Sequence, residues 1–312
     1  TGAQSLAGLT LDSGTVYAGP ALAVPGNLTA SATLSPSEIQ GTLLTGPTPV
    51  TWLVNGLASP GLRITGSIGH TGGSSADITK AGAGLLQVND APGYTHTGLL
   101  LTLTSGTLEW NDSPDGAGDF GPVILMNGGA LRGEGQVRQI SSLSGGHISP
   151  GVGTGVLTSG QTELRENVTF LAEWTGSGDR LAVQGTLALN NATLFLSGSE
   201  PAYGSPWMLV ENDGADPVSG HFAGLPEGAT LTTDGALLRI SYTGGDGNDV
   251  VLTRIVPEAP VMSSFEIGGA LPGSGGNVTG EGAGLPGFTY ALEYSSDLTA
   301  WTEAVDATAD GT

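Results

Sequence analysis

The residues with the clearest potential for chemistry lie in a glycine- and aspartate-rich stretch from Gly244 to Leu252, with the sequence GGDGNDVVL. Asp246 and Asp249 place two carboxylates in this stretch, and glycines flank the first of them. Carboxylate and backbone carbonyl oxygens are the ligands that calcium prefers in proteins. We therefore expect no obligatory cofactor, with calcium at Asp246 and Asp249 as the candidate metal site.

The same stretch resembles the nonapeptide G-G-x-G-x-D-x-U-x of repeats-in-toxin proteins, which stack into parallel β-rolls. The resemblance implies calcium held between stacked copies, with Asp249 as a carboxylate ligand. Only one copy occurs in this chain. The alternative is a β-hairpin, in which residues 240–243 pair with residues 250–253 across a Gly/Asp/Asn turn. A single copy favours the hairpin.

Other candidate sites in the sequence are weaker. The acidic loops at 111–119 and 211–216 offer oxygen ligands without the spacing of an EF-hand. Residues 282–287 fit GxGxxG but lack the strand and helix that a dinucleotide site requires. The four histidines are scattered, and no nucleophile elbow or phosphate loop occurs. We therefore predict no catalytic residues and no enzyme activity. Five N-x-[ST] triplets lie at Asn27, Asn111, Asn167, Asn191 and Asn277. Chance explains most of them in a chain rich in these residues, and the alternative is that some carry glycan in a producer that glycosylates its surface proteins.

Glycine is the outlier in the composition of the chain. The 312 residues include 54 glycines, more than twice the usual share of about 7%. Hydrophobic residues make up 38% and recur in short alternating runs, such as Val168, Phe170, Ala172 and Trp174. Such alternation indicates strands that turn one face to a core, and glycine suits the tight corners between them.

A glycine followed by a small or polar residue and an alternating strand recurs along the chain. The intervals are 18 to 30 residues, and the glycines are Gly14, Gly41, Gly66, Gly84, Gly106, Gly129, Gly155 and Gly185. This period suits one coil of a solenoid with two or three short strands. We therefore predict an all-β protein, with a parallel β-helix or solenoid over residues 1–255 and a partial β-sandwich-like segment after it.

Residues 76–112 resemble the autotransporter-associated β-strand repeat. The matching positions are Thr79, Lys80, Gly82, Gly84, Leu86, Val88, Tyr94, Thr95, Gly98, Gly106, Thr107 and Leu108. His96 departs from the pattern of this family, so we expect local reshaping of that coil. The resemblance implies a passenger-type β-solenoid that is extracellular or on a bacterial cell surface.

A proline-rich segment, VPEAP at 256–260, predicts a stiff linker between two domains. Beyond it, strand-like runs lie at 263–267, 277–280, 289–294 and 301–305, and YALEYSSDLTAWTE resembles a β-sandwich segment of secreted proteins from environmental bacteria. An immunoglobulin-like sandwich has about seven strands. We therefore expect residues 261–312 to form an incomplete domain, which later residues or a strand supplied in trans complete.

The negative charge of the chain limits the classes of molecule that it can bind. Asp and Glu number 29 against 8 Lys and Arg, giving a net charge of −21, and cysteine is absent. Such a surface repels nucleic acid and anionic lipid, and no apolar run approaches the roughly 18 residues of a membrane span. We therefore expect neither nucleic-acid binding nor membrane insertion.

The function expected from this pattern is that of an extracellular structural protein, a stalk or self-assembling filament subunit. Self-association would use end stacking or strand donation. The first alternative is an adhesin that binds cell-surface or matrix glycans, which an exposed row of tryptophans would support. The second is a polysaccharide-active β-helix enzyme, which would need carboxylates converging in a groove.

Overall fold

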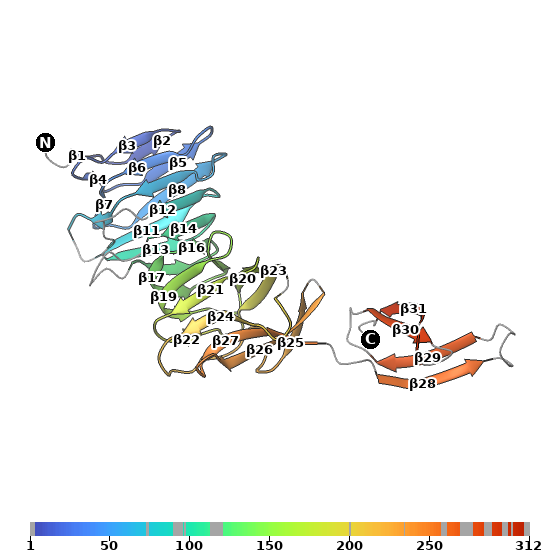
Figure 1. Cartoon of the computed structure of the whole chain (residues 1–312). Helices are drawn as coiled ribbons and strands as arrows, with labels where there is room; N and C mark the ends of the chain where they lie inside the picture. Colours follow the sequence, from blue (N-terminus) through green and yellow to red (C-terminus); the bar gives the residue numbers. More distant parts are fainter. Residues whose placement is uncertain are drawn as a thin grey trace.

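The computed structural model describes residues 4–72, 75–89, 96, 98–112, 121–199, 201–233 and 235–256, and towards the C-terminus residues 261–268, 277–283, 289–294, 299–300 and 302–308. The described residues contain no helix, and strands account for 58% of the structure. Parallel strands stack in about eight turns (Figure 1). The all-β solenoid predicted from the sequence is therefore confirmed.

The coils are built from three sheets, and neighbouring strands of one sheet come from successive coils. Sheet A contains β1 (Gln4–Ser5), β4 (Leu22–Val24), β7 (Leu43–Thr45) and β10 (Ile68–His70). Sheet C contains β3 (Thr15–Tyr17), β6 (Ser37–Gln40), β9 (Leu62–Thr65), β12 (Leu85–Asn89), β14 (Thr107–Asn111), β16 (Ala130–Gly133), β18 (Gly146–Pro150), β20 (Val168–Trp174) and β23 (Thr193–Gly198).

Sheet B extends along the whole solenoid and has the most strands. Its parallel part contains β2 (Leu9–Leu11), β5 (Leu28–Ala32), β8 (Val50–Gly56), β11 (Ala76–Ala81), β13 (Leu99–Leu103), β15 (Val123–Met126), β17 (Gln136–Ser142), β19 (Val156–Glu163), β21 (Arg180–Val183) and β24 (Pro206–Asn212), with β22 (Leu187–Ala188) also beside β19. Its last strands are β27 (Asp249–Arg254), β26 (Ala236–Gly244) and β25 (Thr230–Thr233).

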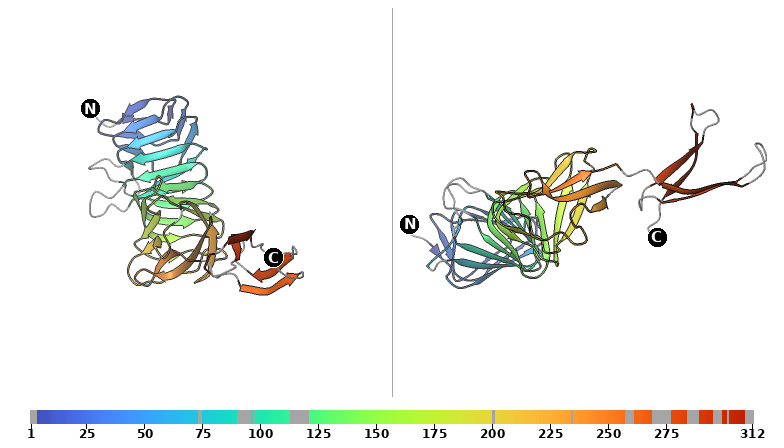
Figure 2. Two further views of the ribbon diagram at one scale, coloured as in Figure 1. Left: turned by 45° about the vertical axis from the view of Figure 1, so that its right-hand side comes forward. Right: turned by 90° about the horizontal axis from the view of Figure 1, so that it is seen from below.

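The cross-section of the solenoid changes along its length. The first coils are three-sided because each has a strand in sheet A, which ends with β10 among the described residues. The later coils use strands of sheets B and C, and Figure 2 shows this stack from two further sides. The tightest coil pairs Ile124 of β15 with Ile140 of β17, sixteen residues later. Its corner is a glycine pair, of which Gly128 has a φ of 104°.

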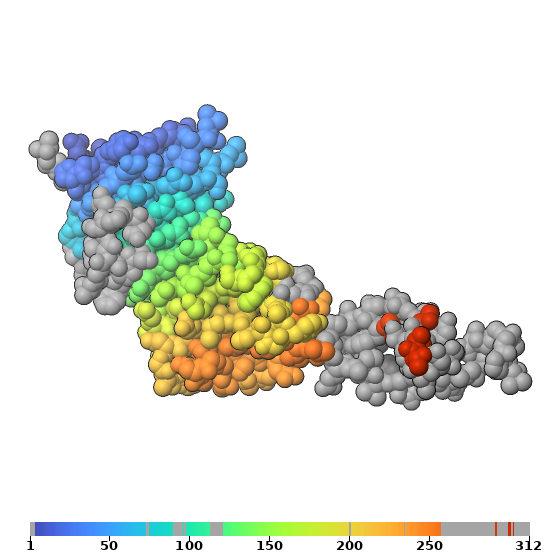
Figure 3. All heavy atoms as spheres, in the orientation of Figure 1, coloured from blue at the N-terminus to red at the C-terminus, as the bar shows by residue number. Residues whose placement is uncertain are grey.

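Columns of apolar side chains run through the solenoid because the strand register places equivalent residues above one another. The column of sheet B is nowhere more than 4% exposed and consists of Val50, Ile78, Leu101, Ile124 and Ile140. The facing column of sheet C is fully buried and consists of Leu62, Leu86, Leu108, Leu131, Ile148 and Phe170. Each coil therefore adds one layer to a continuous core, and Figure 3 shows the coils following one another in sequence order.

The end of the solenoid towards β25 is closed by an antiparallel cap. β27 pairs antiparallel with both β24 and β26, and β25 pairs antiparallel with β26. Phe222 is 1% exposed, and its ring lies 5.7 Å from that of Phe170. The Tyr242 hydroxyl donates to the carbonyl of Leu225 at 2.6 Å and accepts from the N–H of Phe222 at 3.0 Å. Residues 1–255 therefore end in a plugged cap rather than in further stacked coils.

Two antiparallel hairpins follow the solenoid. β28 (Val261–Gly268) pairs with β29 (Asn277–Ala283), and β30 (Thr289–Tyr294) pairs with β31 (Thr302–Thr308). Each hairpin is a separate two-stranded sheet. An isolated hairpin is marginally stable in water. The incomplete sandwich expected for residues 261–312 stays a prediction. Residues 257–260 of the expected linker lie outside the described residues.

Candidate functional site

The glycine- and aspartate-rich stretch forms the tight turn between β26 and β27, as the hairpin alternative predicts. The Asp249 side chain is buried, and its two oxygens accept from the backbone N–H groups of Asn212 at 2.8 Å and Asp246 at 3.3 Å. The Asn248 amide donates to the carbonyl of Asp216 at 3.0 Å. Asp249 therefore ties the turn to the end of β24, which is a structural role.

Metal binding at this turn gains no further support from the neighbouring acidic residues. Within the described ranges, no three His, Cys, Asp or Glu side chains come together in a way that could hold a metal ion. In the 211–216 loop, Glu211 pairs with Arg180 at 3.2 Å. Asp115 and Asp119 of the other acidic loop lie outside the described residues. Calcium at Asp246 and Asp249 stays a prediction.

The single lysine of the chain is buried in the core. Lys80 of β11 lies between Trp52 of β8 and Leu103 of β13 in sheet B and is fully buried. Its Nζ donates to the carbonyls of Gly82 at 2.7 Å and Ser105 at 2.9 Å, which belong to the corners of two successive coils. Burial lowers the pKa of Lys80 to about 8. The sequence pattern marks this lysine, but nothing in it indicates that the amine binds the corner carbonyls.

The stability of wild type relative to Lys80→Met is expected to rise with pH above neutrality. Because the pKa of Lys80 is about 8 when folded and about 10.4 when unfolded, the unfolded chain binds more protons between these values. The free energy of unfolding of wild type minus that of Lys80→Met, measured with urea, should increase by about 2 kcal/mol from pH 7.5 to pH 10. Arg165→Met, at an exposed position, is the control and should show no such gain. An equal difference at both pH values would contradict the burial of a charged amine.

The side chain of His96 accepts a backbone hydrogen bond at β10, the last strand of sheet A among the described residues. Its Nδ1 accepts from the N–H of Ile68 in β10 at 3.1 Å, where a strand of the next coil would offer a carbonyl. Its Nε2 lies 3.4 Å from a carboxylate oxygen of Asp112, and its ring packs edge-on to Trp110 with centroids 4.9 Å apart. The histidine therefore has a structural role, and the local reshaping expected at His96 stays a prediction because residues 90–95 and 97 lie outside the described residues.

A ladder of polar side chains crosses the outer face of sheet C. Gln87 donates to Glu109 at 2.6 Å, Arg132 forms an ion pair with Glu109 at 2.6 Å, and Arg63 donates to Gln87 at 2.7 Å. Burial alone would raise the pKa of Glu109, but hydrogen bonds from Gln87, Asn111 and Arg132 and the charge of Arg132 hold it below its ordinary value. The ladder therefore fixes the register of four successive coils.

A hollow of about 370 Å³ lies near the capped end of the solenoid. It is lined by Thr154, Gly155, Val156, Trp174, Ser177, Gly178, Arg180, Pro206, Trp207 and Met208. The half-buried indole of Trp174 stands edge-on to the buried indole of Trp207, with ring centroids 5.3 Å apart. Arg180 and Glu211 form an ion pair beside it, at 3.2 Å. The sequence places these residues in different coils, so only the fold brings them together.

The four tryptophans that the structure describes form no exposed row of the kind that a glycan-binding passenger would use. Trp52, Trp110 and Trp207 are at most 3% exposed, and Trp174 is half-buried. Trp301 lies outside the described residues. Aromatic side chains thus serve mainly as core, and the Trp174 hollow is where indoles line a depression in the described part of the chain.

No family model matches the sequence of the whole chain, and no curated protein matches it. The likeness of residues 76–112 to a known repeat therefore stands on their sequence pattern alone. No helix of the described residues is long and apolar enough to cross a membrane.

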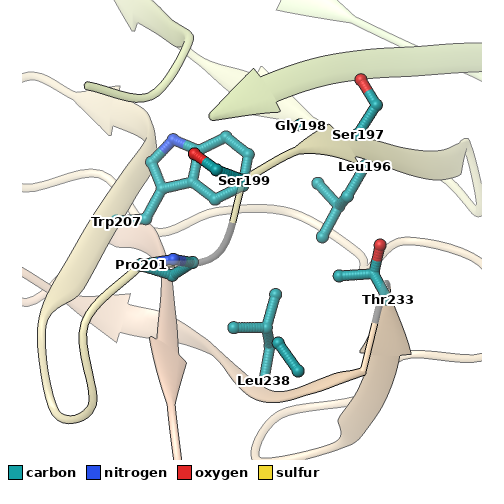
Figure 4. Close-up of a pocket in the computed structure, with 9 residues that line it drawn as sticks. Leu196, Ser197, Gly198, Ser199, Pro201, Trp207, Thr233 and Leu238 are labelled. Carbon is teal, nitrogen blue, oxygen red and sulfur yellow. The ribbon is translucent and has the colours of Figure 1, made fainter. Parts of the chain in front are cut away.

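A second, narrower space separates β23 from the cap (Figure 4). It is lined mainly by apolar side chains, including Leu196, Trp207, Leu238 and Pro201, and its volume of about 10 Å³ leaves little room beyond one water. It lies where sheet C ends at β23 while sheet B continues into the antiparallel strands. β23 is therefore an edge strand above an incompletely filled part of the core.

Proposed function

We propose that the chain is an extracellular structural protein of a bacterial cell surface, a stalk or filament subunit built on autotransporter-type repeats. The observation that carries this proposal is the unbroken parallel ladder of sheet B from β2 to β24 over one continuous core. A stack of this kind transmits load along its axis through backbone hydrogen bonds. The net charge of −21 favours solubility outside the cell.

A role without catalysis is supported by what the titratable side chains do. Among the residues that the structure describes, the groups with shifted pKa values are Lys80, Glu109, Asp179 and Tyr242. Each makes hydrogen bonds within the fold, to corner carbonyls, neighbouring coils or the cap. Perturbed groups of an active site converge on a cleft, whereas these four are spread along the solenoid.

Self-association is the second part of the proposal, and β23 is the edge that we propose for it. β23 is the outermost strand of sheet C, and Phe195 on its outer face is 57% exposed. An edge strand with an apolar face is a template for a strand of a neighbouring molecule. The apolar space between Leu196 and Leu238 would be covered by such an added strand.

Wild type is expected to assemble reversibly as its concentration rises. Phe195→Lys should raise the protein concentration needed for assembly by at least about tenfold, since a charge on an edge strand opposes pairing. Sedimentation velocity across a hundredfold concentration range measures this. Leu57→Lys is the matched control because Leu57 is 89% exposed in a turn, away from β23. A monomer at every concentration, or equal assembly of Phe195→Lys and wild type, would overturn the proposed interface.

A further inference from the structure

The hollow beside Trp174 is built rather than incidental. Its walls are two turns, one at 151–155 and the other at 174–178, and the Asp179 carboxylate holds both. One oxygen of Asp179 accepts from the N–H of Gly155 at 3.0 Å, and the other accepts from the N–H of Glu173 at 2.9 Å. Asp179 itself is fully buried.

The floor of the hollow is equally fixed. The indole N–H of Trp207 donates to the backbone carbonyl of Asp179 at 2.9 Å. Gly178 lies directly against this indole, and a Cβ at that position would overlap the ring. Trp174 stands edge-on to this fixed ring, with the ring centroids 5.3 Å apart. A rigid aromatic surface costs little conformational entropy when a ligand binds to it.

The lining has the chemistry of a saccharide site. Val156, Trp174 and Met208 supply an apolar surface, and Thr154 and Ser177 supply hydroxyl groups at its edge. A pyranose ring presents C–H groups on one face and hydroxyl groups around its rim, which matches this division. The volume of about 370 Å³ is at the small end of the roughly 300–1,000 Å³ of ligand pockets, which suits one or two sugar rings.

Charge decides between neutral and acidic sugars. The one cation of the lining, Arg180, is already paired with Glu211, and the whole chain carries a net charge of −21. An anionic sugar would therefore meet repulsion without a free cation to bind it. We propose that the Trp174 hollow binds a neutral pyranose of a glycan. This binding is independent of the rod function and of the β23 edge, since it uses other residues.

Binding to the whole chain is expected for at least one of five neutral hexasaccharides, namely those of cellulose, laminarin, xylan, mannan and starch. Saturation-transfer NMR detects the contact, and calorimetry gives the Kd. Trp174→Ala should weaken binding about tenfold, since the stacking surface is lost. Tyr17→Ala, at a 75% exposed aromatic residue of β3 outside the hollow, should leave the Kd unchanged.

Ser177→Trp provides a second variant because it fills the hollow from an exposed turn without removing a core contact. It should abolish binding while circular dichroism and the thermal midpoint stay those of wild type. The proposal is overturned if none of the five sugars binds at about 10 mM, or if both variants bind as wild type does. Binding of oligogalacturonate in preference to every neutral sugar would also overturn it.

Discussion

Replacing Phe222 by alanine is expected to destabilise the solenoid by about 3–5 kcal/mol, the range for deleting a large buried aromatic side chain. Phe222 is buried and packs against Phe170 of β20, the last but one strand of sheet C. Its loss would leave a cavity at the open end of a column, where water can enter. Because each coil of a solenoid contacts only its neighbours, unfolding should then begin at this end.

Urea unfolding measures the loss, and hydrogen exchange locates it. Amides of β24 and β27 should exchange faster in Phe222→Ala, whereas those of β8 and β11 should not change. Tyr17→Ala is the control, since Tyr17 of β3 is 75% exposed, and this change should cost less than about 0.5 kcal/mol. A loss below about 1 kcal/mol for Phe222→Ala would mean that the cap does not close the core.

The repeat could be predicted from the sequence because it rests on local rules. Alternation of apolar residues fixes which side chains enter the core, and glycines fix the corners. The columns from Val50 to Ile140 and from Leu62 to Phe170 confirm that logic. The hairpin at Gly244–Leu252 could also be predicted from the sequence, because turn residues between two apolar runs specify it locally.

The cap and the hollow could not be predicted in the same way. Phe222 lies in a segment without alternation, and its burial depends on a hydroxyl of Tyr242 that comes twenty residues later. Trp174, Arg180 and Trp207 reach one hollow only because the turns before β21 and β24 have particular shapes. Lys80 carries an amine that is ordinarily exposed, yet it lies between Trp52 and Leu103 because corner carbonyls from two coils satisfy this amine. Each case requires contacts between coils, which a single-sequence pattern does not encode.

Gly133→Ala is expected to destabilise the protein by about 3–5 kcal/mol, while Gly247→Ala should cost about 1–2 kcal/mol. Both glycines have a positive φ of nearly the same size, 129° and 123°, so both variants carry a similar backbone strain. They differ in the space around them. A Cβ at Gly133 would overlap the backbone carbonyl of Trp110 in the preceding coil, whereas a Cβ at Gly247 would meet nothing within 4 Å.

The difference between the two variants therefore measures how tightly neighbouring coils approach. Urea unfolding of both, with circular dichroism as the probe, gives that difference in free energy. A gap of about 2 kcal/mol or more would show that Gly133 is required for coil contact beyond its φ, because Trp110 cannot withdraw without losing the hydrogen bond from its indole N–H to the carbonyl of Gln136 at 3.0 Å. Equal losses in the free energy of unfolding would show instead that the corner at Gly133 relaxes around the added Cβ, so that the close approach of β14 and β16 does not require glycine there.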